Sequence, residues 1–187
     1  KESNGGSATV QAGVDNAFIG LSGDLAKSGI REIDGGAHSG VTVAANSGSG
    51  LLDFSGINVN NATILTGDGN QTVLVGSGQM TIVAGNGNDL FLLSEHSGNV
   101  SILGNSSGSW TDTIDLHKLG SNDTFSVTLL DAHDNVVGGW TGLVANGPTA
   151  THDISIDASL HGVIQVQHSD GSANDTIAFQ HVEHLKY

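Results

Sequence analysis

Two glycine-rich turns hold the residues of this chain best suited to bind a metal ion. Each reads Gly-x-Gly followed by two polar residues, at 67–71 and at 85–89. Carboxylate and amide oxygens are hard ligands of the kind that Ca²⁺ prefers. Glycine suits such turns because it accepts positive φ and lets the backbone approach a metal closely. The candidate metal-binding residues are Gly67, Asp68, Gly69, Gln71, Gly85, Asn86, Gly87, Asn88 and Asp89.

The charge of the chain makes cations better partners than anions. There are 19 acidic residues against five Lys and Arg, which gives a formal net charge of −14. Nucleic acid and anionic membrane surfaces are therefore poor partners. Carboxylates stacked ~4.8 Å apart repel each other by a few kcal/mol at an effective dielectric of ~20. A bound divalent cation would turn that cost into a gain, so we expect Ca²⁺ as the cofactor.

The other residues that could carry chemistry follow no catalytic spacing. Nine His are scattered, no Cys is present, and no zinc-type spacing occurs, so we expect solvated surface His. No Gly-x-Ser-x-Gly turn stands between a strand and a helix. We expect no enzymatic activity. Trp110 and Trp140 could stack on sugar rings, or could be core or cap residues.

The two turns belong to a run of three consecutive nine-residue units, and the strands of these units must hold the turns in place. They begin at Thr63, Thr72 and Thr81, with a β-branched residue second and Gly in the fifth and seventh places. A short fixed period of β-branched strand and glycine-rich turn predicts a solenoid of stacked rungs. The inward side chains are expected to be Ile64, Val73, Ile82 and Phe91.

Two units should make one coil, so each turn should stack on the next turn but one. Turn 67–71 then lies over turn 85–89 and should form the Ca²⁺ site, whereas turn 76–80 lies over 94–98 and offers few ligands. Alternation along each strand points a second apolar column outward, alternating between two sheets. Either a terminal segment covers this column, or it is a docking surface for a like molecule. The column is Leu65, Leu74, Val83 and Leu92.

Changes in the residue pattern along the sequence divide the chain into three parts. Residues 1–29 read as an N-terminal cap segment, 30–119 as the β-roll or β-solenoid, and 120–187 as an antiparallel β cap. The cap is expected because 125–130 and 136–140 flank a polar turn, as in a hairpin. No stretch approaches ~20 apolar residues, so no segment should insert into a membrane. We interpret a chain that begins at Lys1 as a processed product or an excised fragment.

The unit Gly85-Asn-Gly-Asn-Asp-Leu-Phe-Leu resembles the nonapeptide of repeats-in-toxin (RTX) proteins, Gly-Gly-x-Gly-x-Asp-x-apolar-x. The resemblance implies a parallel β-roll that binds Ca²⁺ in its turns and folds after secretion. Asp89 takes the acidic position, where the neighbouring units have Gln71 and Met80. Two single units, at 108–114 and 171–177, suggest further metal-binding residues. These are Asp112, Asn174 and Asp175.

These observations predict an all-β fold, a parallel β-roll or β-solenoid with an antiparallel C-terminal cap. The resemblance implies an extracellular, Ca²⁺-stabilised structural module of a secreted bacterial surface protein, such as an adhesin or a surface-layer or fibre subunit. Its partners would be like subunits or extracellular polysaccharide. The alternatives are a polysaccharide-binding module of a secreted carbohydrate-active protein and a fragment of an RTX enzyme or toxin. An ice-binding solenoid is disfavoured, because Thr72 should lie on the opposite sheet from Thr63 and Thr81.

Overall fold

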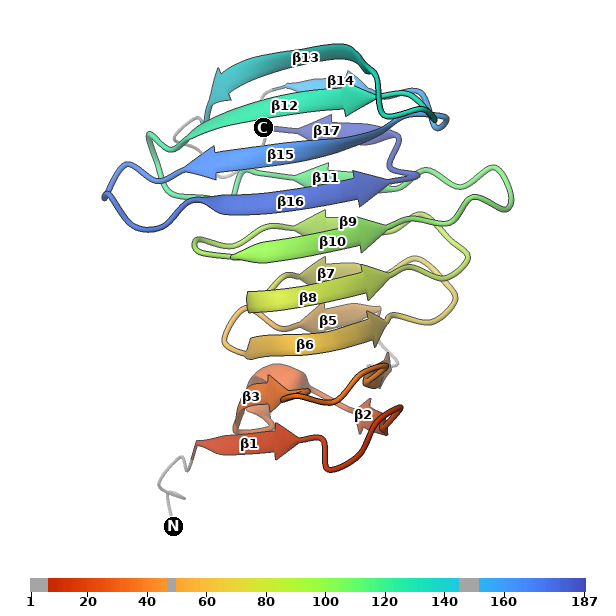
Figure 1. Ribbon diagram of the computed structural model, residues 1–187, viewed down its shortest axis with the longest axis vertical. Coiled ribbons are helices and arrows are strands. Elements are labelled where there is room, and N and C mark those ends of the chain that lie inside the picture. The colour runs from red at the N-terminus through yellow and green to blue at the C-terminus, as the bar shows by residue number, and fades with distance from the viewer. Residues whose placement is uncertain (1–6, 47–49, 145–151) are drawn as a thin grey trace.

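The chain winds into a β-solenoid whose rungs lie in two facing sheets (Figure 1). A computed structural model describes residues 7–46, 50–144 and 152–187. Within them the only helical element is the short 3-10 helix η1 (Leu25–Lys27). Sheet A contains β1 (Ala8–Gln11), β2 (Phe18–Ser22), β3 (Ile30–Asp34), β4 (Thr42–Asn46), β6 (Asn58–Leu65), β8 (Ser77–Val83), β10 (Asn99–Leu103), β12 (Thr124–Leu130), β13 (Val136–Leu143), β15 (His161–Gln167) and β16 (Asp175–Gln180). Sheet B contains β5 (Leu51–Asp53), β7 (Thr72–Leu74), β9 (Leu90–Leu92), β11 (Thr113–Asp115), β14 (Asp153–Ser155) and β17 (His184–Lys186).

The parallel register confirms the predicted coil. Thr63 pairs with Thr81 in sheet A, and Thr72 pairs with Leu90 in sheet B, so one coil here consists of two of the repeat units. Thr72 therefore lies on the opposite sheet from the other two Thr, as expected. The next coil is longer, since Leu90 pairs in turn with Thr113.

The interior is a column of aliphatic and aromatic side chains that the rungs contribute in turn. The four predicted inward residues, Ile64, Val73, Ile82 and Phe91, are all 0% exposed. Burying one such side chain stabilises the fold by roughly 1.5–3 kcal/mol, so the repeat itself builds the core.

The second apolar column is half-buried on the outer faces, as the alternation predicts. Leu65 and Val83 lie on sheet A, where Leu103 continues the row. The strands nearest the two ends do not cover these side chains. Strand β1 pairs beside β3, and β17 pairs beside β11, so both extend the sheets instead.

Parallel pairing extends beyond 30–119 in both directions. Strands β1 and β2 pair in parallel with β3 and β4, so rungs already begin within the segment expected as an N-terminal cap. After β11 the chain leaves the solenoid and returns only near its C-terminal end, when β16 adds to β10 and β17 adds to β11, both in parallel. The excursion supplies the antiparallel strands β12, β13 and β15, which confirm the antiparallel cap.

One predicted turn is wrong. Residues 76–80 do not form a free turn, because Ser77–Met80 lie within β8. Gln79 pairs with Asn99 of β10, so this part of the chain extends the sheet. The segment still stacks over 94–98 as expected, because a Cβ at Gly98 would collide with the Gly78 carbonyl oxygen.

Candidate metal-binding corner

The turns that lead from sheet A to sheet B stack along one edge of the solenoid, which we call the A-to-B corner. It consists of residues 66–71, 84–89, 104–112 and 181–183, on the right in Figure 1. The first two turns are the pair predicted to stack. Their backbones touch, since the Gly69 N–H donates to the Asn86 carbonyl at 2.6 Å.

Glycine makes this close stacking possible. A Cβ at Gly85 would collide with the Gly67 carbonyl oxygen, and one at Gly87 would lie 2.6 Å from the Gly69 backbone. Gly87 also has φ +133°, a conformation that L side chains rarely adopt. The repeated glycines therefore serve contact between turns as well as turn geometry.

Asp and Asn side chains form two ladders along the corner. Asp68 Oδ1 accepts hydrogen bonds from the backbone and side-chain N–H groups of Asn86, both at 3.0 Å. Asn86 Oδ1 accepts in turn from Asn105 Nδ2 at 2.8 Å. In the second ladder, Asn70 Oδ1 accepts from the Asn88 N–H at 2.9 Å, and Asn88 Oδ1 accepts from the Thr111 N–H at 3.0 Å.

A third ladder consists of carboxylates, and we call it the acidic column: Asp89, Asp112 and Glu183. Each accepts a backbone N–H from the turn one coil before. Asp89 Oδ1 accepts from Gln71 at 2.7 Å, Asp112 Oδ1 from Asp89 at 2.8 Å, and Glu183 Oε2 from Asp112 at 2.7 Å. Asp89 and Asp112 are each 1% exposed. Three acids are thus stacked, two of them with little access to water and Glu183 half-buried.

This stacking disfavours negative charge in the column. Burial raises the pKa of Asp89 to about 6, the hydrogen bond from Gln71 opposes the rise, and the Asp112 charge adds to it. Burial also raises the pKa of Asp112, and the neighbouring Glu183 charge acts in the same direction. Asp89 Oδ2 is buried and has no hydrogen-bond partner among the described residues.

The lone Asp89 Oδ2 is the observation that fits a hard cation. Carboxylate and carbonyl oxygens are the donors that Ca²⁺ takes, and the column supplies anionic oxygens without nearby Lys or Arg in its hydrogen bonds. The oxygens Asp68 Oδ1 and Asn70 Oδ1 already accept amide hydrogens. Gln71 turns its Nε2 toward the Asp68 carbonyl, so it presents a donor there. Among the described residues, no group of three or more His, Cys, Asp or Glu side chains is arranged to hold a metal by itself.

The predicted further ligands are divided between two places. Asp112 joins Asp89 in the acidic column. Asp175 lies instead at the opposite corner, where its two oxygens accept from the Ser97 and Gly98 N–H groups, both at 2.8 Å. Asn174 precedes Asp175 and lines a hollow on sheet A.

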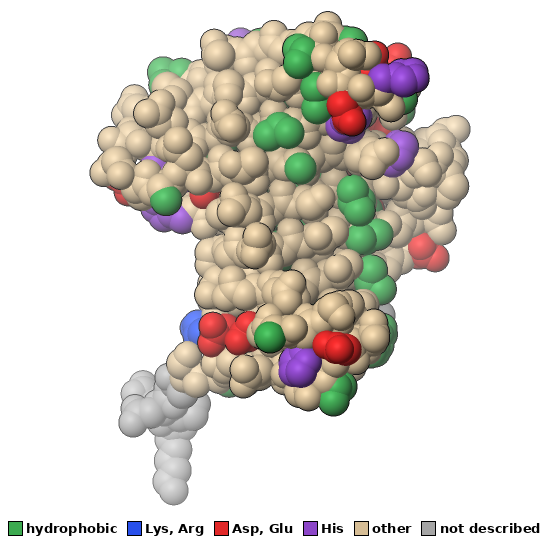
Figure 2. All heavy atoms as spheres, in the orientation of Figure 1, with side chains coloured by type: hydrophobic (Ala, Val, Ile, Leu, Met, Phe, Trp, Pro, Cys, Tyr) green, Lys and Arg blue, Asp and Glu red, His purple; other side chains and the backbone are tan. Residues whose placement is uncertain are grey.

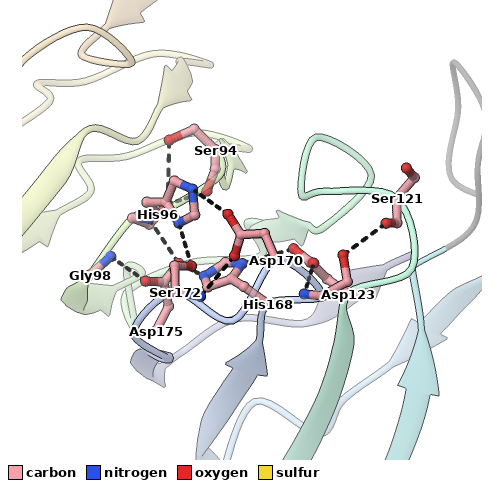
Figure 3. A network of polar contacts seen from close by, with 11 residues as sticks. Ser94, His96, Gly98, Ser121, Asp123, His168, Asp170, Ser172 and Asp175 are labelled. Atoms are coloured by element: carbon pink, nitrogen blue, oxygen red, sulfur yellow. Dashed lines mark hydrogen bonds and ion pairs between the residues drawn. The ribbon is translucent and has the colours of Figure 1, made fainter.

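A buried histidine between two carboxylates joins the solenoid to its cap at that opposite corner (Figure 3). His168 Nδ1 lies 2.8 Å from Asp123 Oδ2, and His168 Nε2 lies 3.2 Å from Asp175 Oδ2. All three side chains are at most 3% exposed. Burial disfavours the charged imidazole, but the two carboxylates outweigh it and raise the pKa of His168. The expectation of solvated His is therefore wrong for this residue.

A Ser-His-Asp arrangement also lies in the region that Figure 3 shows. Ser172 Oγ is 3.2 Å from His96 Nδ1, and His96 Nε2 is 3.8 Å from Asp170 Oδ2. All three side chains lie on the surface, and the Ser172 N–H donates to Asp170 Oδ1 within a tight turn. This is the geometry of a polar loop that holds its own shape.

The two Trp lie far apart in the fold. Trp110 is on the 104–112 turn and is 41% exposed. Trp140 is on β13 and packs partly against the core.

Sequence reasoning missed Glu183, Asp123 and His168. The first lies 71 residues from its partner Asp112, and His168 lies 45 residues from Asp123. No local pattern marks these pairs. The only available signal was the second RTX-like unit around Asp175, which indicated a rung near the C-terminal end.

Comparison of the chain with protein-family models, with curated proteins and with solved structures gave no match. In the described part of the chain, no helix is long and apolar enough to cross a membrane.

Proposed function

We propose that this chain is a Ca²⁺-stabilised, non-enzymatic β-solenoid module of a secreted bacterial surface protein, with a structural or matrix-binding role outside the cell. The single observation that carries the proposal is the acidic column, with a buried carboxylate oxygen that has no hydrogen-bond partner in the described part of the chain. Such an oxygen favours a proton or a cation, and the RTX-like turn around Asp89 favours Ca²⁺.

The proposal also explains how export and folding could be linked. Where free Ca²⁺ is scarce, the acidic column and the net charge of −14 oppose compaction. Where Ca²⁺ is abundant, a ligand at ~100 times its dissociation constant adds about 2.7 kcal/mol per site. That is a substantial share of the roughly 5–15 kcal/mol typical of a folded protein.

The residues with a role in this account are Asp89, Asp112 and Glu183 as anionic oxygens, and Asp68 and Asn86 as the adjacent ladder. Bound Ca²⁺ would supply positive charge to neutralise the column. The chain's own contribution is the stacking of the turns, which holds the oxygens in place through backbone hydrogen bonds.

The test is a Ca²⁺ titration of chelator-treated protein, followed by circular dichroism and thermal melting, with Mg²⁺ as the control ion. We expect Ca²⁺ to raise the melting temperature and Mg²⁺ to have little effect. The double variant Asp68→Ala/Asp89→Ala should lose most of the response. Asp24→Ala/Asp134→Ala is the matched control, because it removes two exposed acids away from the corner. If the two double variants had the same Ca²⁺ midpoint, the A-to-B corner would not be the Ca²⁺ site.

A further inference from the structure

The outer face of sheet A is free of charge over four consecutive rungs. Strands β6, β8, β10 and β16 point no Asp, Glu, Lys or Arg outward, although the chain is strongly acidic as a whole. Over β6 to β10, Figure 2 shows this face in tan and green, with acidic side chains gathered below it. The outward residues are Asn58, Asn60, Thr63, Leu65, Ser77, Gln79, Thr81, Val83, Asn99, Ser101, Leu103, Thr176, Ala178 and Gln180.

Polar side chains on this face stand in two columns that run along the solenoid axis. The parallel register places one residue of each column on each rung, at the ~4.8 Å strand spacing. The amide column is Asn60, Gln79 and Asn99, followed by Thr176. The hydroxyl column is Thr63, Thr81 and Ser101, followed by Ala178.

Two adjoining hollows follow these columns. One, of ≈ 410 Å³, lies between the columns over the backbone of Ala62, Met80 and Val100, whose side chains are buried beneath the sheet. The other, of ≈ 500 Å³, lies on the far side of the amide column and reaches Asn174, with His96 and Asp175 also in its lining. Gln79 and Asn99 line both hollows. Neither Trp lines them, so stacking on Trp110 or Trp140 plays no part here.

The polar groups of this face are available to a ligand. Gln79 and Asn99 are exposed, and their side chains make no hydrogen bond to any described residue. The same holds for the hydroxyls of Thr81 and Ser101. The Asn side chains of the A-to-B corner differ, because each is hydrogen-bonded to the next rung.

We propose that this face binds an uncharged polysaccharide whose chain lies along the solenoid axis, between the amide and hydroxyl columns. Amides and hydroxyls match sugar hydroxyls as donors and acceptors. The absence of positive charge gives an anionic polymer nothing to pair with, and the net charge of −14 repels it. The rungs of β6, β8 and β10 each present one amide and one hydroxyl, so a polymer with a regular repeat can meet three rungs in succession.

The inference names the site and ligand class for the matrix-binding half of the proposed function, but the groove itself needs no metal. The probes are dextran, laminarin and galactomannan as uncharged polymers and alginate as the anionic one. Binding is measured by affinity gel electrophoresis, then by calorimetry with oligosaccharides of the polymer that retards the protein. The test variant is Gln79→Ala/Asn99→Ala. The control is Gln11→Ala/Gln167→Ala, which removes two exposed amides of sheet A that lie outside strands β6, β8, β10 and β16 and outside both hollows.

We expect retardation by at least one uncharged polymer and none by alginate. The affinity of the test variant should fall about tenfold or more, because its side chains no longer form hydrogen bonds with the sugar. The control should bind with normal affinity. Equal affinities for the two variants, or no retardation of folded protein by any uncharged polymer, would overturn the proposal. So would a concentration-dependent dimer that the test variant alone abolishes, since a second copy would then occupy the face.

The same samples keep the two proposals separable. Circular dichroism with and without Ca²⁺ reports on the metal, whereas retardation of folded protein reports on the groove. Ca²⁺-dependent folding without glycan binding refutes the groove alone. Glycan binding by a protein indifferent to Ca²⁺ refutes the metal site alone.

Discussion

Replacing Asp89 by Asn tests the electrostatics of the acidic column directly. Asn keeps an oxygen to accept the Gln71 N–H, now 2.7 Å from Asp89 Oδ1. It replaces the partnerless Oδ2 with an NH₂ group that faces the column without negative charge. We therefore expect Asp89→Asn to stabilise the metal-free protein at neutral pH, although the substitution removes a native carboxylate.

The magnitude follows from the pKa of Asp89. Burial moves it from 3.8 to about 6, which corresponds to about 3 kcal/mol. Because the folded-state pKa is the higher one, this stability is fully present below pH 3.8 and is lost as the pH rises through about 6. At neutral pH and above, the natural protein has lost this stability because Asp89 is ionised. The Asn variant keeps the stability, because Asn does not ionise. For a protein of this size, ~3 kcal/mol moves the melting temperature by roughly 6–12 °C.

The assay is thermal melting in chelator from about pH 4 to about pH 8, for the natural protein and for Asp89→Asn. The difference between the two curves should grow as the pH rises from the ordinary pKa of Asp to the raised one, and then level off. Added Ca²⁺ at the upper end of this range should reverse the order, since only the natural protein retains the carboxylate. A variant less stable than the natural protein there in chelator, or a difference that does not change with pH, would refute the reasoning.

Two further predictions concern the cap junction and the stacked turns. His168→Gln should cost about 3 kcal/mol near pH 6, because it leaves Asp123 and Asp175 buried without their cation. The raised pKa of His168 means that this contribution is present below its ordinary value of 6.5 and fades as the pH rises through the higher folded value. Urea unfolding at about pH 6 and about pH 9 measures both, and an equal loss at the two pH values would contradict it. Gly87→Ala should destabilise by about 1–3 kcal/mol through backbone strain and contact with Gly69. Gly67→Ala, which also has positive φ but no atom within 4 Å of its Cβ, should cost less in the same denaturation assay.

Local periodicity was sufficient to predict the solenoid and its inward face. The nine-residue unit repeats a short strand and a tight turn, and a chain that repeats one local geometry must wind into equivalent rungs. Period-two alternation then decides which side chain of each strand is buried, as Ile64 and Ile82 show. The stacking of turns 67–71 and 85–89 follows from the same arithmetic.

Extrapolating the same period failed at 76–80. There the chain continues as strand, because Gln79 finds a pairing partner in Asn99 of the next rung. Strand length depends on what the neighbouring strand offers, and a repeat cannot specify that.

The sequence alone determined the class of fold, the direction of the core residues and the glycine turns, since all of these depend on residues a few positions apart. Only the tertiary structure decided that the chain leaves the solenoid after β11 and returns to lay β16 against β10 and β17 against β11. That return completes the acidic column with Glu183, encloses His168 between two carboxylates and extends the charge-free face with Thr176. The physical reason is that a free sheet edge accepts any strand whose backbone and buried side chains fit, so the strand that completes a site can lie at any distance along the chain.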